Sequence, residues 1–492
     1  MLALNGISVI APCRVLRNNL QQTEVGSMHS IETINRIIAL LFAICYFYQY
    51  IYVLVPYFKK YRIVPKNSGN AGKATIADAD LNRKQNRFAA VICARNEEKT
   101  LENCIRTLLA QDYPGGIRVF VAADNCTDKT AEIARHAGAI VYERNDLTKI
   151  GKGYALNFIF KHIEKDYPNA FDAFFIFDAD NLVDEHYTAE MNKMLNAGYD
   201  VATCFRNSKN YDDSWISAGS GLWYVRESRY LNESRYLLGS GCAVSGTGFM
   251  VSSEYLKKIG GWNYFLLIED IEFTVCCAVA GEHIGYCKNA VIYDEQPATM
   301  KASWKQRLRW SKGYLQLIQA HGGDLFKGIF RGIFKKGDFT CFDIGMNIFP
   351  AYLLGIVAQI VNIVGIIVSV CIGSGITTVL LSILQILFNS YIIAFVVGLI
   401  ATIDMWKIIP AKTAKKILYI FTFPIYMMTY LPISVAAIFS KASWVPTVHE
   451  CTRSLDDLRG KSEKSETETL EKRDRTHTLK KAVNGNEAEI ED

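Results

Sequence analysis

The hydrophobic and polar positions divide this chain into regions of two kinds. Residues 34–58 carry an apolar stretch of about 20 residues, long enough to cross a bilayer, and basic residues follow it at once. Residues 342–403 contain two more apolar stretches, 344–372 and 376–403, separated by a Gly-Ser-Gly turn at 373–375. The pattern predicts one transmembrane helix before the central part of the chain and a tight pair of transmembrane helices after it.

A further apolar segment, residues 417–440, is interrupted by Pro424 and Pro432. Basic residues lie on both sides of it, and such residues favour the cytosolic face of a membrane. This arrangement predicts an interfacial or re-entrant helix, with a full crossing as the alternative. The basic residues after position 58 likewise place the region that follows on the cytosolic side.

Residues 87–335 show a different pattern, in which short apolar runs alternate with stretches of helical periodicity. The run 174–177 is continuous and apolar, as in a strand buried on both faces. Runs at 88–92, 118–122 and 139–142 are separated by helical stretches, an order typical of α/β domains. We therefore expect one α/β domain with a mostly parallel sheet.

The remaining segments are polar. Residues 1–33 are predicted to be a disordered N-terminal segment, with Met28 as an alternative start of translation, and residues 59–86 a linker. Residues 453–492 are rich in charged and hydroxylated side chains and are predicted to form a disordered tail, because they have too few apolar side chains to bury a core.

Several predicted strands end in acidic side chains. Glu97, Asp124, Asp178 and Asp180 each follow an apolar run. Because open parallel sheets bind ligands outside the carboxyl ends of their strands, these acids are expected to share one crevice. Two acids separated by one residue can both supply oxygens to a hard cation such as Mg²⁺ or Mn²⁺. Lys152, in a Gly-Lys-Gly sequence beside this crevice, is a candidate phosphate contact.

Two later motifs add candidate chemistry. Gly248, in the sequence Gly-Thr-Gly-Phe, either lets the backbone approach a ligand closely or forms a plain turn. Glu269 and Asp270 open a predicted helix, where acids also occur as ordinary complements of the helix dipole.

A third motif lies on a predicted helix face. Gln306, Arg309 and Trp310 are spaced i, i+3 and i+4, so they share one side of a helix. A helix face with an amide, a guanidinium and an indole is poorly suited to packing in a hydrophobic core. These three groups suit a pyrophosphate and a sugar ring, because a guanidinium binds phosphate with two donors and an indole offers a flat apolar face.

The bulk composition narrows the class of protein. With 492 residues the chain exceeds one ordinary domain, and its net charge of +5 is too small to argue for a nucleic-acid partner. The 13 cysteines include no CxxC pair, so we expect reduced thiols rather than disulfides or a zinc site.

The chain resembles the processive family 2 glycosyltransferases, such as cellulose, hyaluronan and poly-N-acetylglucosamine synthases, in four motifs taken in order: Asp124, Asp178-Ala179-Asp180, Glu269-Asp270 and Gln306-Arg307-Leu308-Arg309-Trp310. The resemblance covers residues 88–320 and extends to the membrane segments. It implies a GT-A fold and an inverting transfer from a nucleotide sugar, usually a UDP-sugar, to a growing polysaccharide. The implied partners are the nucleotide sugar, a divalent cation (Mg²⁺ or Mn²⁺), a polysaccharide or lipid-linked acceptor, the membrane, and export or accessory subunits, with no nucleic acid.

The resemblance also implies a role for each motif position. Asp270 resembles the general base and Glu269 its companion, while Asp180 resembles the metal ligand. Trp310 and Gly248 are expected on the acceptor side. The residues expected at the nucleotide or the donor sugar are Arg95, Asn96, Glu97, Asp124, Lys152, Asp178, Gln306, Arg309, Trp444 and Thr447.

The last two of these residues belong to segment 441–452, which resembles the gating loop that processive synthases place over the bound nucleotide. The alternative for Trp444 is an anchor at the lipid headgroups. The chain departs from the family at Arg95, where cellulose synthases tend to carry an aromatic residue, and at Ile268, which replaces a common threonine.

Two other functions stay open. One is the transfer of a single sugar to a lipid carrier or glycolipid by a non-processive enzyme. The other is a transport or scaffold subunit with a degenerate transferase domain. In each case the chain is expected in the cell membrane as a multi-pass protein with its catalytic domain in the cytosol.

Overall fold

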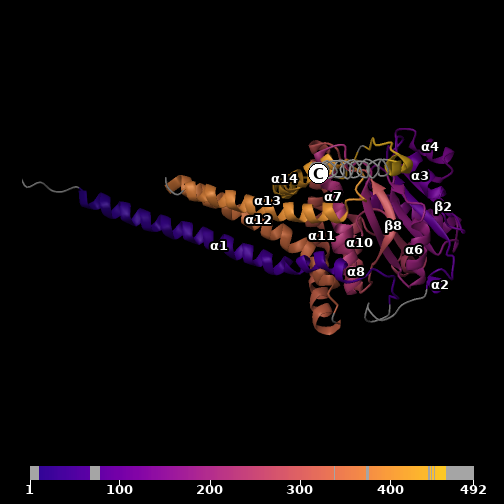
Figure 1. Cartoon of the computed structure of the whole chain (residues 1–492), viewed down its shortest axis with the longest axis horizontal. Coiled ribbons are helices and arrows are strands. Elements are labelled where there is room, and N and C mark those ends of the chain that lie inside the picture. The colour runs from indigo at the N-terminus through magenta and orange to yellow at the C-terminus, as the bar shows by residue number, and fades with distance from the viewer. Residues whose placement is uncertain are drawn as a thin grey trace, which may run out of the picture.

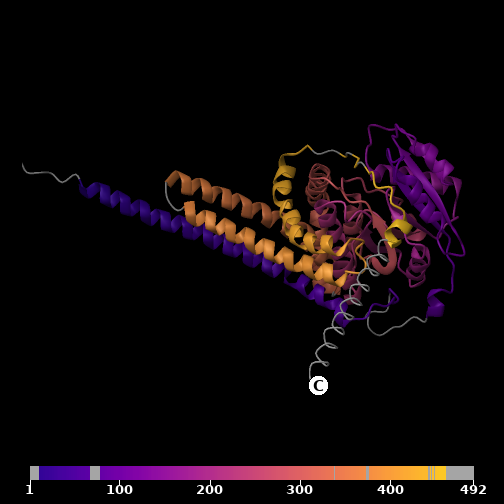
Figure 2. The same ribbon diagram turned by 45° about the horizontal axis from the view of Figure 1, so that its top comes forward.

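The computed structural model of the protein has a sheet-containing domain at one end and a bundle of long helices at the other (Figure 1). The structure describes residues 10–66, 78–336, 338–372, 376–441, 444, 446–447 and 449–460. Three long helices run side by side away from the domain (Figure 1 and Figure 2): α1 (Ile10–Phe58), α12 (Thr340–Ile372) and α13 (Ile376–Asp404). The predicted turn at 373–375 lies outside the described residues.

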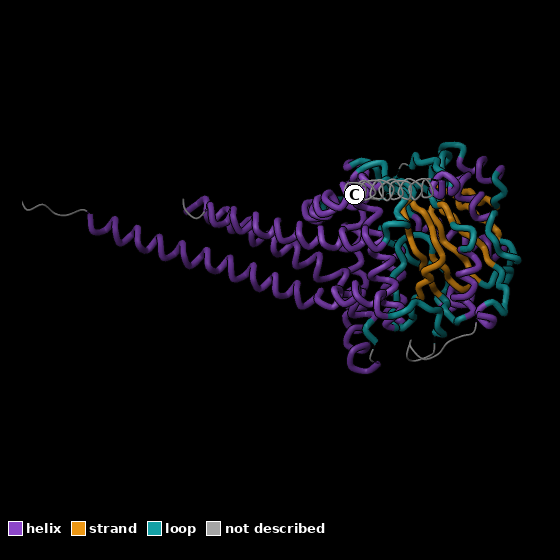
Figure 3. Tube along the Cα trace, in the orientation of Figure 1, coloured by secondary structure: helices purple, strands orange, loops and turns teal. Residues whose placement is uncertain are grey.

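The domain is built on one eight-stranded sheet, drawn in orange in Figure 3. Its strands are β1 (Phe88–Ala94), β2 (Ile117–Asp124), β3 (Ile140–Arg144), β4 (Ala173–Asp178), β5 (Leu182–Val183), β6 (Val201–Ser208), β7 (Phe249–Ser252) and β8 (Gly285–Asp294). They lie in the order β3-β2-β1-β4-β7-β6-β8-β5. The strands β3, β2, β1 and β4 are parallel, so their carboxyl ends meet at one edge.

The sheet is mixed, which corrects the prediction of a mostly parallel sheet. β7 runs antiparallel to both of its neighbours, β4 and β6, and β5 runs antiparallel to β8. Apolar runs indicate that a strand is buried, but they carry no information about its direction. β7 enters the sheet from the loop 239–248 rather than from a crossover helix, and an antiparallel strand needs no such crossover.

Other helices complete the domain and join it to the bundle. They are α2 (Asp78–Leu81), α3 (Leu101–Leu109), α4 (Thr130–His136), α5 (Lys152–Asp166), α6 (Tyr187–Asn196), α7 (Trp215–Arg226), the π-helix η1 (Glu227–Asn232), α8 (Glu233–Leu238), α9 (Ser253–Lys258), α10 (Glu269–Ala280), α11 (Met300–Arg331) and the π-helix η2 (Gly332–Lys336). The long helix α11 contacts α10 of the domain and α12 of the bundle, so it joins the two parts.

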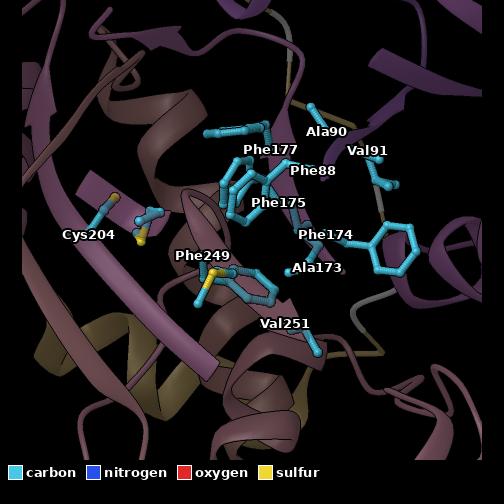
Figure 4. Close-up of a cluster of buried hydrophobic side chains, with 14 of the residues drawn as sticks. Phe88, Ala90, Val91, Ala173, Phe174, Phe175, Phe177, Cys204, Phe249 and Val251 are labelled. Atoms are coloured by element: carbon cyan, nitrogen blue, oxygen red, sulfur yellow. The ribbon is translucent and has the colours of Figure 1, made fainter. Parts of the chain in front are cut away.

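The core of the domain packs around β4. Figure 4 shows Phe88, Phe175 and Phe177 grouped together, and the rings of Phe88 and Phe175 stack with their centroids 4.7 Å apart. Phe175, Ile176 and Phe177 are fully buried, as predicted for a strand covered on both faces. Burying each such side chain stabilises the fold by about 1.5–3 kcal/mol. β4 is therefore a rigid support for Asp178, its last residue.

Three described helical segments are long and apolar enough to cross a membrane: Thr33–Phe58, Ile383–Asp404 and Thr413–Phe439. The predicted span 344–372 lies in α12, where several side chains fall outside the described residues. Within the bundle, Gln49 of α1 donates from Nε2 to Asn347 Oδ1 of α12 at 3.1 Å. This polar contact fixes the two helices against each other.

Helix α1 is longer than predicted. It begins at Ile10, so residues 10–33 are helical rather than disordered, while residues 1–9 lie outside the described residues. A hydropathy pattern locates the part of a helix that suits the bilayer, but it does not mark the first helical turn. The predicted linker 59–86 contains the short helix α2 and is otherwise irregular where it is described.

The apolar segment 417–440 forms two helices, α14 (Thr413–Met428) and α15 (Tyr430–Phe439), which meet at Thr429. Pro432 lies in the first turn of α15, where its missing N–H costs no helical hydrogen bond. The buried Arg307 of α11 donates from Nη1 to Thr429 Oγ1 at 2.6 Å and so holds the junction. The interfacial or re-entrant placement of this segment stays a prediction.

The chain after α15 returns to the domain. Arg453 Nη1 pairs with Asp212 Oδ1 at 2.9 Å, and Arg459 Nη2 pairs with Asp184 Oδ2 at 3.2 Å. Residues 453–460 are therefore ordered against the domain, which corrects the start of the predicted disordered tail; residues 461–492 lie outside the described residues. Composition did not reveal this contact because the acidic partners lie far away in the sequence.

Candidate active site

One cavity opens at the carboxyl ends of β1, β2 and β4 and has a volume of ≈ 640 Å³. Helices α7, α10, α11 and α15 and the chain after α15 form its other walls. The predicted residues that line it are Arg95, Glu97, Asp124, Lys152, Asp178, Asp180, Glu269, Asp270, Gln306, Arg309, Trp310, Trp444 and Thr447. The structure thus brings these side chains to one crevice, while the role of each stays a prediction.

Asp124 ends β2 and is almost fully buried. Arg144 is the residue directly opposite it on the parallel strand β3, and its Nη1 donates to Asp124 Oδ1 at 2.5 Å. Burial raises the pKa of Asp124, although the contact with Arg144 opposes the shift. Sequence reasoning missed Arg144, because only the strand register shows that it faces Asp124.

Asp178 ends β4 and pairs with Lys152, the first residue of α5. Lys152 Nζ also donates to the carbonyl oxygen of Gly246 at 2.7 Å. Gly246 has a φ of +82°, a conformation that favours glycine. A Cβ atom at this position would lie 3.7 Å from Asp270 Oδ2 and 4.0 Å from Asp178 Oδ2. Gly246 therefore keeps a narrow space open between the two carboxylates.

Asp180 lies just beyond β4 and is almost fully buried. Its Oδ2 accepts a hydrogen bond from the backbone N–H of Glu295 at 2.9 Å. Lys209 Nζ donates to the carbonyl oxygen of Asp180 at 2.7 Å and pairs with Glu295 Oε2 at 3.2 Å. The N–H of Glu295, just after β8, thus orients the Asp180 carboxylate, and Lys209, just after β6, ties the Asp180 backbone to Glu295.

Asp180 is also the predicted ligand of a divalent cation, and this role stays a prediction. Its Oδ1 has a long contact, 3.4 Å, from Asn181 Nδ2, whereas the Oδ1 of Asp178 is taken by Lys152. In the part of the chain that the structure describes, no three His, Cys, Asp or Glu side chains are grouped to hold an ion. One carboxylate is sufficient for a cation such as Mg²⁺ that also binds phosphate oxygens and water.

Glu269 and Asp270 are the first residues of α10 and line the cavity opposite β4. Burial raises the pKa of both carboxyl groups, and the neighbouring charge of Asp270 adds to the shift of Glu269. Lys152 and Arg309 oppose this rise. A carboxylate with a raised pKa is a stronger proton acceptor, so this environment suits a general base better than a mere complement of the helix dipole.

One face of α11 lines the cavity with Gln306, Arg309 and Trp310, as their spacing predicts. Arg309 Nη1 donates to the carbonyl oxygen of Leu267 at 2.9 Å, which fixes the guanidinium beside the start of α10. The ring of Trp310 meets the ring of Tyr224 edge-on, with centroids 6.5 Å apart. This face therefore presents a cation and a flat aromatic surface to the cavity.

The chain after α15 covers one side of the cavity with Trp444 and Thr447. Arg95 Cζ lies 5.3 Å from the centroid of a Trp444 ring, within the range of a cation–π contact. This contact favours the predicted loop over the nucleotide site rather than a tryptophan at the lipid headgroups. Residues 442–443, 445 and 448 of the predicted gating loop lie outside the described residues.

His449 of the same segment was not predicted as a site residue, yet it lines the cavity. Its Nδ1 lies 2.9 Å from Glu97 Oε1. Burial opposes a charge on the imidazole, but the carboxylates of Asp180, Glu97 and Glu295 outweigh burial and raise the pKa of His449 to about 10. A histidine so close to Trp444 and Thr447 in the sequence was the available signal.

A buried ion pair on the far wall was also missed. Arg206 of β6 pairs with Asp294, the last residue of β8, and its Cζ lies 3.6 Å from the centroid of the Tyr224 ring. Burial raises the pKa of Asp294 to about 6, although Arg206 opposes the shift. The signal in the sequence was the single charge within β6 and a charge at the end of β8, because a buried charge requires a partner.

Two predicted site residues lie outside the cavity lining. Asn96 has a φ of +58°, and its Oδ1 accepts a hydrogen bond from the Thr127 backbone N–H at 2.8 Å, so it shapes its loop; its contact with the nucleotide sugar stays a prediction. A Cβ atom at Gly248 would lie 2.6 Å from Cys204 Sγ and 2.6 Å from Ile292 Cδ1. Core packing therefore requires glycine at position 248, and its predicted acceptor role stays a prediction.

The chain is similar to known proteins over its central region. Residues 85–313 match the family model described as "Glycosyltransferase like family 2". The probable glycosyltransferase YdaM of Bacillus subtilis is 25% identical over 268 residues, which cover 49% of this chain and 58% of that protein. The beta-monoglucosyldiacylglycerol synthase of Synechocystis is 25% identical over 232 residues, 46% of this chain and 47% of that protein.

A polymer-forming relative is equally similar. The poly-beta-1,6-N-acetyl-D-glucosamine synthase of Staphylococcus aureus is 24% identical over 230 residues, which cover 45% of this chain and 53% of that protein. The chain thus spans about half the length of the curated relatives it matches.

A solved structure shares the fold. The mannosyltransferase PcManGT from Pyrobaculum calidifontis, in complex with GDP-Man and Mn²⁺, superposes with a TM-score of 0.51 at 15% identity and covers 82% of this chain and 99% of its own. The match confirms a GT-A-like fold, here with a mixed sheet. Over residues 85–313 the chain is therefore similar to glycosyltransferase family 2.

Proposed function

We propose that the protein is a membrane-bound, inverting β-glycosyltransferase that transfers a sugar from a UDP-sugar to a growing polysaccharide. The observation that carries this proposal is the position of the Asp270 carboxylate, across the gap at Gly246 from Asp178 and in one cavity with Asp180. A base on one side of the gap and donor-holding acids on the other side suit attack from the face opposite the leaving group, which inverts the anomeric carbon.

Asp270 acts as the general base of the proposed reaction. A sugar hydroxyl is a poor nucleophile, so a positioned carboxylate has to take its proton as the new bond forms. Burial strengthens Asp270 as a base, while Lys152 and Arg309 favour the deprotonated form that the reaction needs. Trp310, next to Arg309 on α11, offers its face to the acceptor sugar.

Arg309 and Arg95 supply positive charge to the donor side of the cavity. Arg95 Nη1 is buried and has no hydrogen-bond partner among the described residues, as expected of a group that awaits an anionic ligand. A divalent cation held by Asp180 would neutralise charge on the departing diphosphate. The fold relative PcManGT was solved with Mn²⁺ and a nucleotide sugar, which supports this assignment.

Lys152 and Asp124 complete the donor side. Lys152 is bonded to Asp178 and Gly246, so it orients the Asp178 carboxylate as well as facing the diphosphate. Asp124, held by Arg144, is proposed to contact the uracil ring. Trp444 and Thr447 would close over the nucleotide.

Transfer of a single sugar to a lipid carrier or glycolipid is the second candidate function. The similarity to beta-monoglucosyldiacylglycerol synthases supports it, whereas the similarity to poly-beta-1,6-N-acetyl-D-glucosamine synthases supports a polymer. The convergence of every motif acid in one cavity argues against a degenerate, non-catalytic subunit. Incubation of membranes with a labelled UDP-sugar distinguishes polysaccharide synthesis from the transfer of a single sugar to lipid. A product with one sugar on lipid would refute the polymerase.

The proposed location is the cell membrane, with several membrane helices and the catalytic domain in the cytosol. The three apolar helical segments support a membrane protein, and the basic residues after α1 support the orientation. Export or accessory subunits would be needed if the bundle alone does not carry the polymer. Protease protection of the domain in sealed vesicles of known orientation tests this arrangement.

The decisive experiment is a screen of nucleotide sugars with the purified protein in detergent, followed by Asp270→Asn with the active donor. Removing a general base typically slows a reaction by about 10²–10⁴-fold, so this variant should lose transfer while it remains folded and inserted. Retained transfer in Asp270→Asn would remove Asp270 as the base.

A further inference from the structure

The cavity is also lined by residues of the long helices α1 and α12. The part that they line, here called the distal chamber, is used by no step of the proposed reaction. Its walls come from α7, η1, α12 and α15: Trp223, Arg226, Glu227, Ile344, Asn347 and Leu431. A ligand in the distal chamber would therefore touch both the sheet domain and the helices of the bundle.

One side of the distal chamber has a regular arrangement. Trp223, Arg226 and Glu227 are spaced i, i+3 and i+4, and α7 continues into η1 without a gap between Arg226 and Glu227. Arg226 Cζ lies 4.8 Å from the centroid of a Trp223 ring. This is the same spacing, and nearly the same set of side chains, as the α11 face with Gln306, Arg309 and Trp310.

Arg226 lacks the partners that other charges around the distal chamber have. Its buried Nη1 has no hydrogen-bond partner among the residues that the structure describes. In contrast, Arg235 Nε pairs with Asp343 Oδ2 at 2.7 Å, and Glu227 accepts a hydrogen bond from the Ser245 hydroxyl. Because a buried donor without a hydrogen-bond partner is costly, oxygen atoms of a ligand are the natural partners of Arg226 Nη1.

The charges of the distal chamber indicate which ligand fits. Arg226 is balanced by Glu227, and Arg235 by Asp343, so these charges sum to zero. An anionic ligand would gain from Arg226 but would also meet the Glu227 carboxylate. A neutral ligand with several hydroxyl groups donates to Glu227 and accepts from Arg226, and a ring with an apolar C–H face covers the Trp223 indole. A pyranose ring has all three properties.

We infer that Trp223, Arg226 and Glu227 form an acceptor subsite that binds a neutral sugar ring already present on the acceptor. The inference rests on the proposed glycosyl transfer and adds a binding site for a sugar ring of the acceptor. The acceptor carries at least one sugar before the reaction, either as a soluble oligosaccharide or as the headgroup of a glycolipid. A bare diacylglycerol or a lipid phosphate lacks the group that this subsite binds.

The test uses the full chain in detergent and five acceptor probes: cellobiose, chitobiose, monoglucosyldiacylglycerol, dioleoylglycerol and undecaprenyl phosphate. Acceptor KM is measured with the donor that the nucleotide-sugar screen identifies. Binding of each probe is also measured by calorimetry in the presence of UDP, where no turnover is needed. The disaccharides and the glycolipid distinguish the two sources of the sugar ring.

Two variants remove the two polar partners separately. Arg226→Met and Glu227→Gln should each weaken binding of the sugar-bearing probe by about tenfold or more, because each removes a hydrogen bond to a charged group. The KM of the donor should stay near that of the wild type. Arg118→Met is the matched control: Arg118 Cζ lies 5.5 Å from the Tyr167 ring centroid, outside the cavity lining, and its loss should leave acceptor KM unchanged.

The direction of the Glu227→Gln effect separates a neutral ligand from an anionic one. Tighter binding of undecaprenyl phosphate in this variant, with the sugar-bearing probes inactive, would overturn the inference while glycosyl transfer stands. Use of dioleoylglycerol alone, or no calorimetric binding of any sugar-bearing probe, would also overturn it. If no sugar is transferred from any nucleotide sugar, the proposed function fails. Calorimetry in the presence of UDP then still shows whether the subsite binds a sugar and whether that binding depends on Arg226.

Discussion

Gly246→Ala tests whether the gap between the Asp270 and Asp178 carboxylates is what the proposed site requires. The added Cβ would lie 3.7 Å from Asp270 Oδ2 and 4.0 Å from Asp178 Oδ2, which are ordinary van der Waals distances. The folded protein can therefore hold the methyl group without a clash. The methyl group would nevertheless occupy the space in which the acceptor hydroxyl and the donor sugar have to meet.

Two effects of different size are expected. The φ of +82° makes alanine unfavourable by about 1 kcal/mol, which lowers the melting temperature by about 2–4 °C. Displacing the reacting atoms by about 1 Å lowers kcat/KM by about a hundredfold, because the reaction depends on close alignment. Initial rates of labelled sugar transfer and a thermal melt of the same detergent preparation measure the two effects.

Gly261→Ala is the matched control for this substitution. Gly261 has a φ of +88°, and a Cβ there would meet no heavy atom within 4 Å, so alanine brings the same backbone strain without any group in the cavity. Gly261→Ala should lose stability by a similar amount and keep its activity. Equal activities in the two variants would refute the reasoning about the gap.

Three further predictions concern charges in the cavity. Lys152→Met removes a positive charge that lowers the pKa of Glu269 and Asp270, so the acid limb of the pH profile of kcat/KM should move to higher pH. An acid limb that stays in place or moves to lower pH, measured from pH 5 to 9, would contradict this. Arg144→Leu leaves Asp124 buried without its partner and should cost about 3–5 kcal/mol of stability in denaturant unfolding, whereas an exposed substitution such as Arg118→Met should cost little. Removal of divalent cations with EDTA should abolish transfer, and Mg²⁺ or Mn²⁺ should restore it; full activity in EDTA would contradict the assignment of a cation to Asp180.

Some of the site followed directly from local sequence patterns. The continuous apolar run of β4 requires burial on both faces, so the acids after it had to lie at the edge of the sheet. The spacing of Gln306, Arg309 and Trp310 requires one helix face, and the structure shows that face in the cavity. Both patterns depend only on the geometry of a single strand or helix, which the sequence encodes at short range.

Other parts of the site depended on long-range contacts. Gly246 and Gly248 look alike in the sequence. Only the path of the loop before β7 shows that Gly246, and not Gly248, faces the two acids. His449 contacts Glu97, which is 352 positions away. The same applies to Arg453, whose acidic partners order a segment that composition alone predicts to be disordered.

The sequence by itself determined the apolar helices, the buried strands with acids at their ends, and the order of the motifs that resemble family 2. These features rest on hydrophobic periodicity and on residue types at fixed short spacings. The tertiary structure alone decided the reversed direction of β7, the return of the chain after α15 to the cavity, and the pairing of Asp124 with Arg144. Each of these depends on segments that meet only after the chain has folded, because strand register and ion pairing are set by packing between distant parts of the sequence.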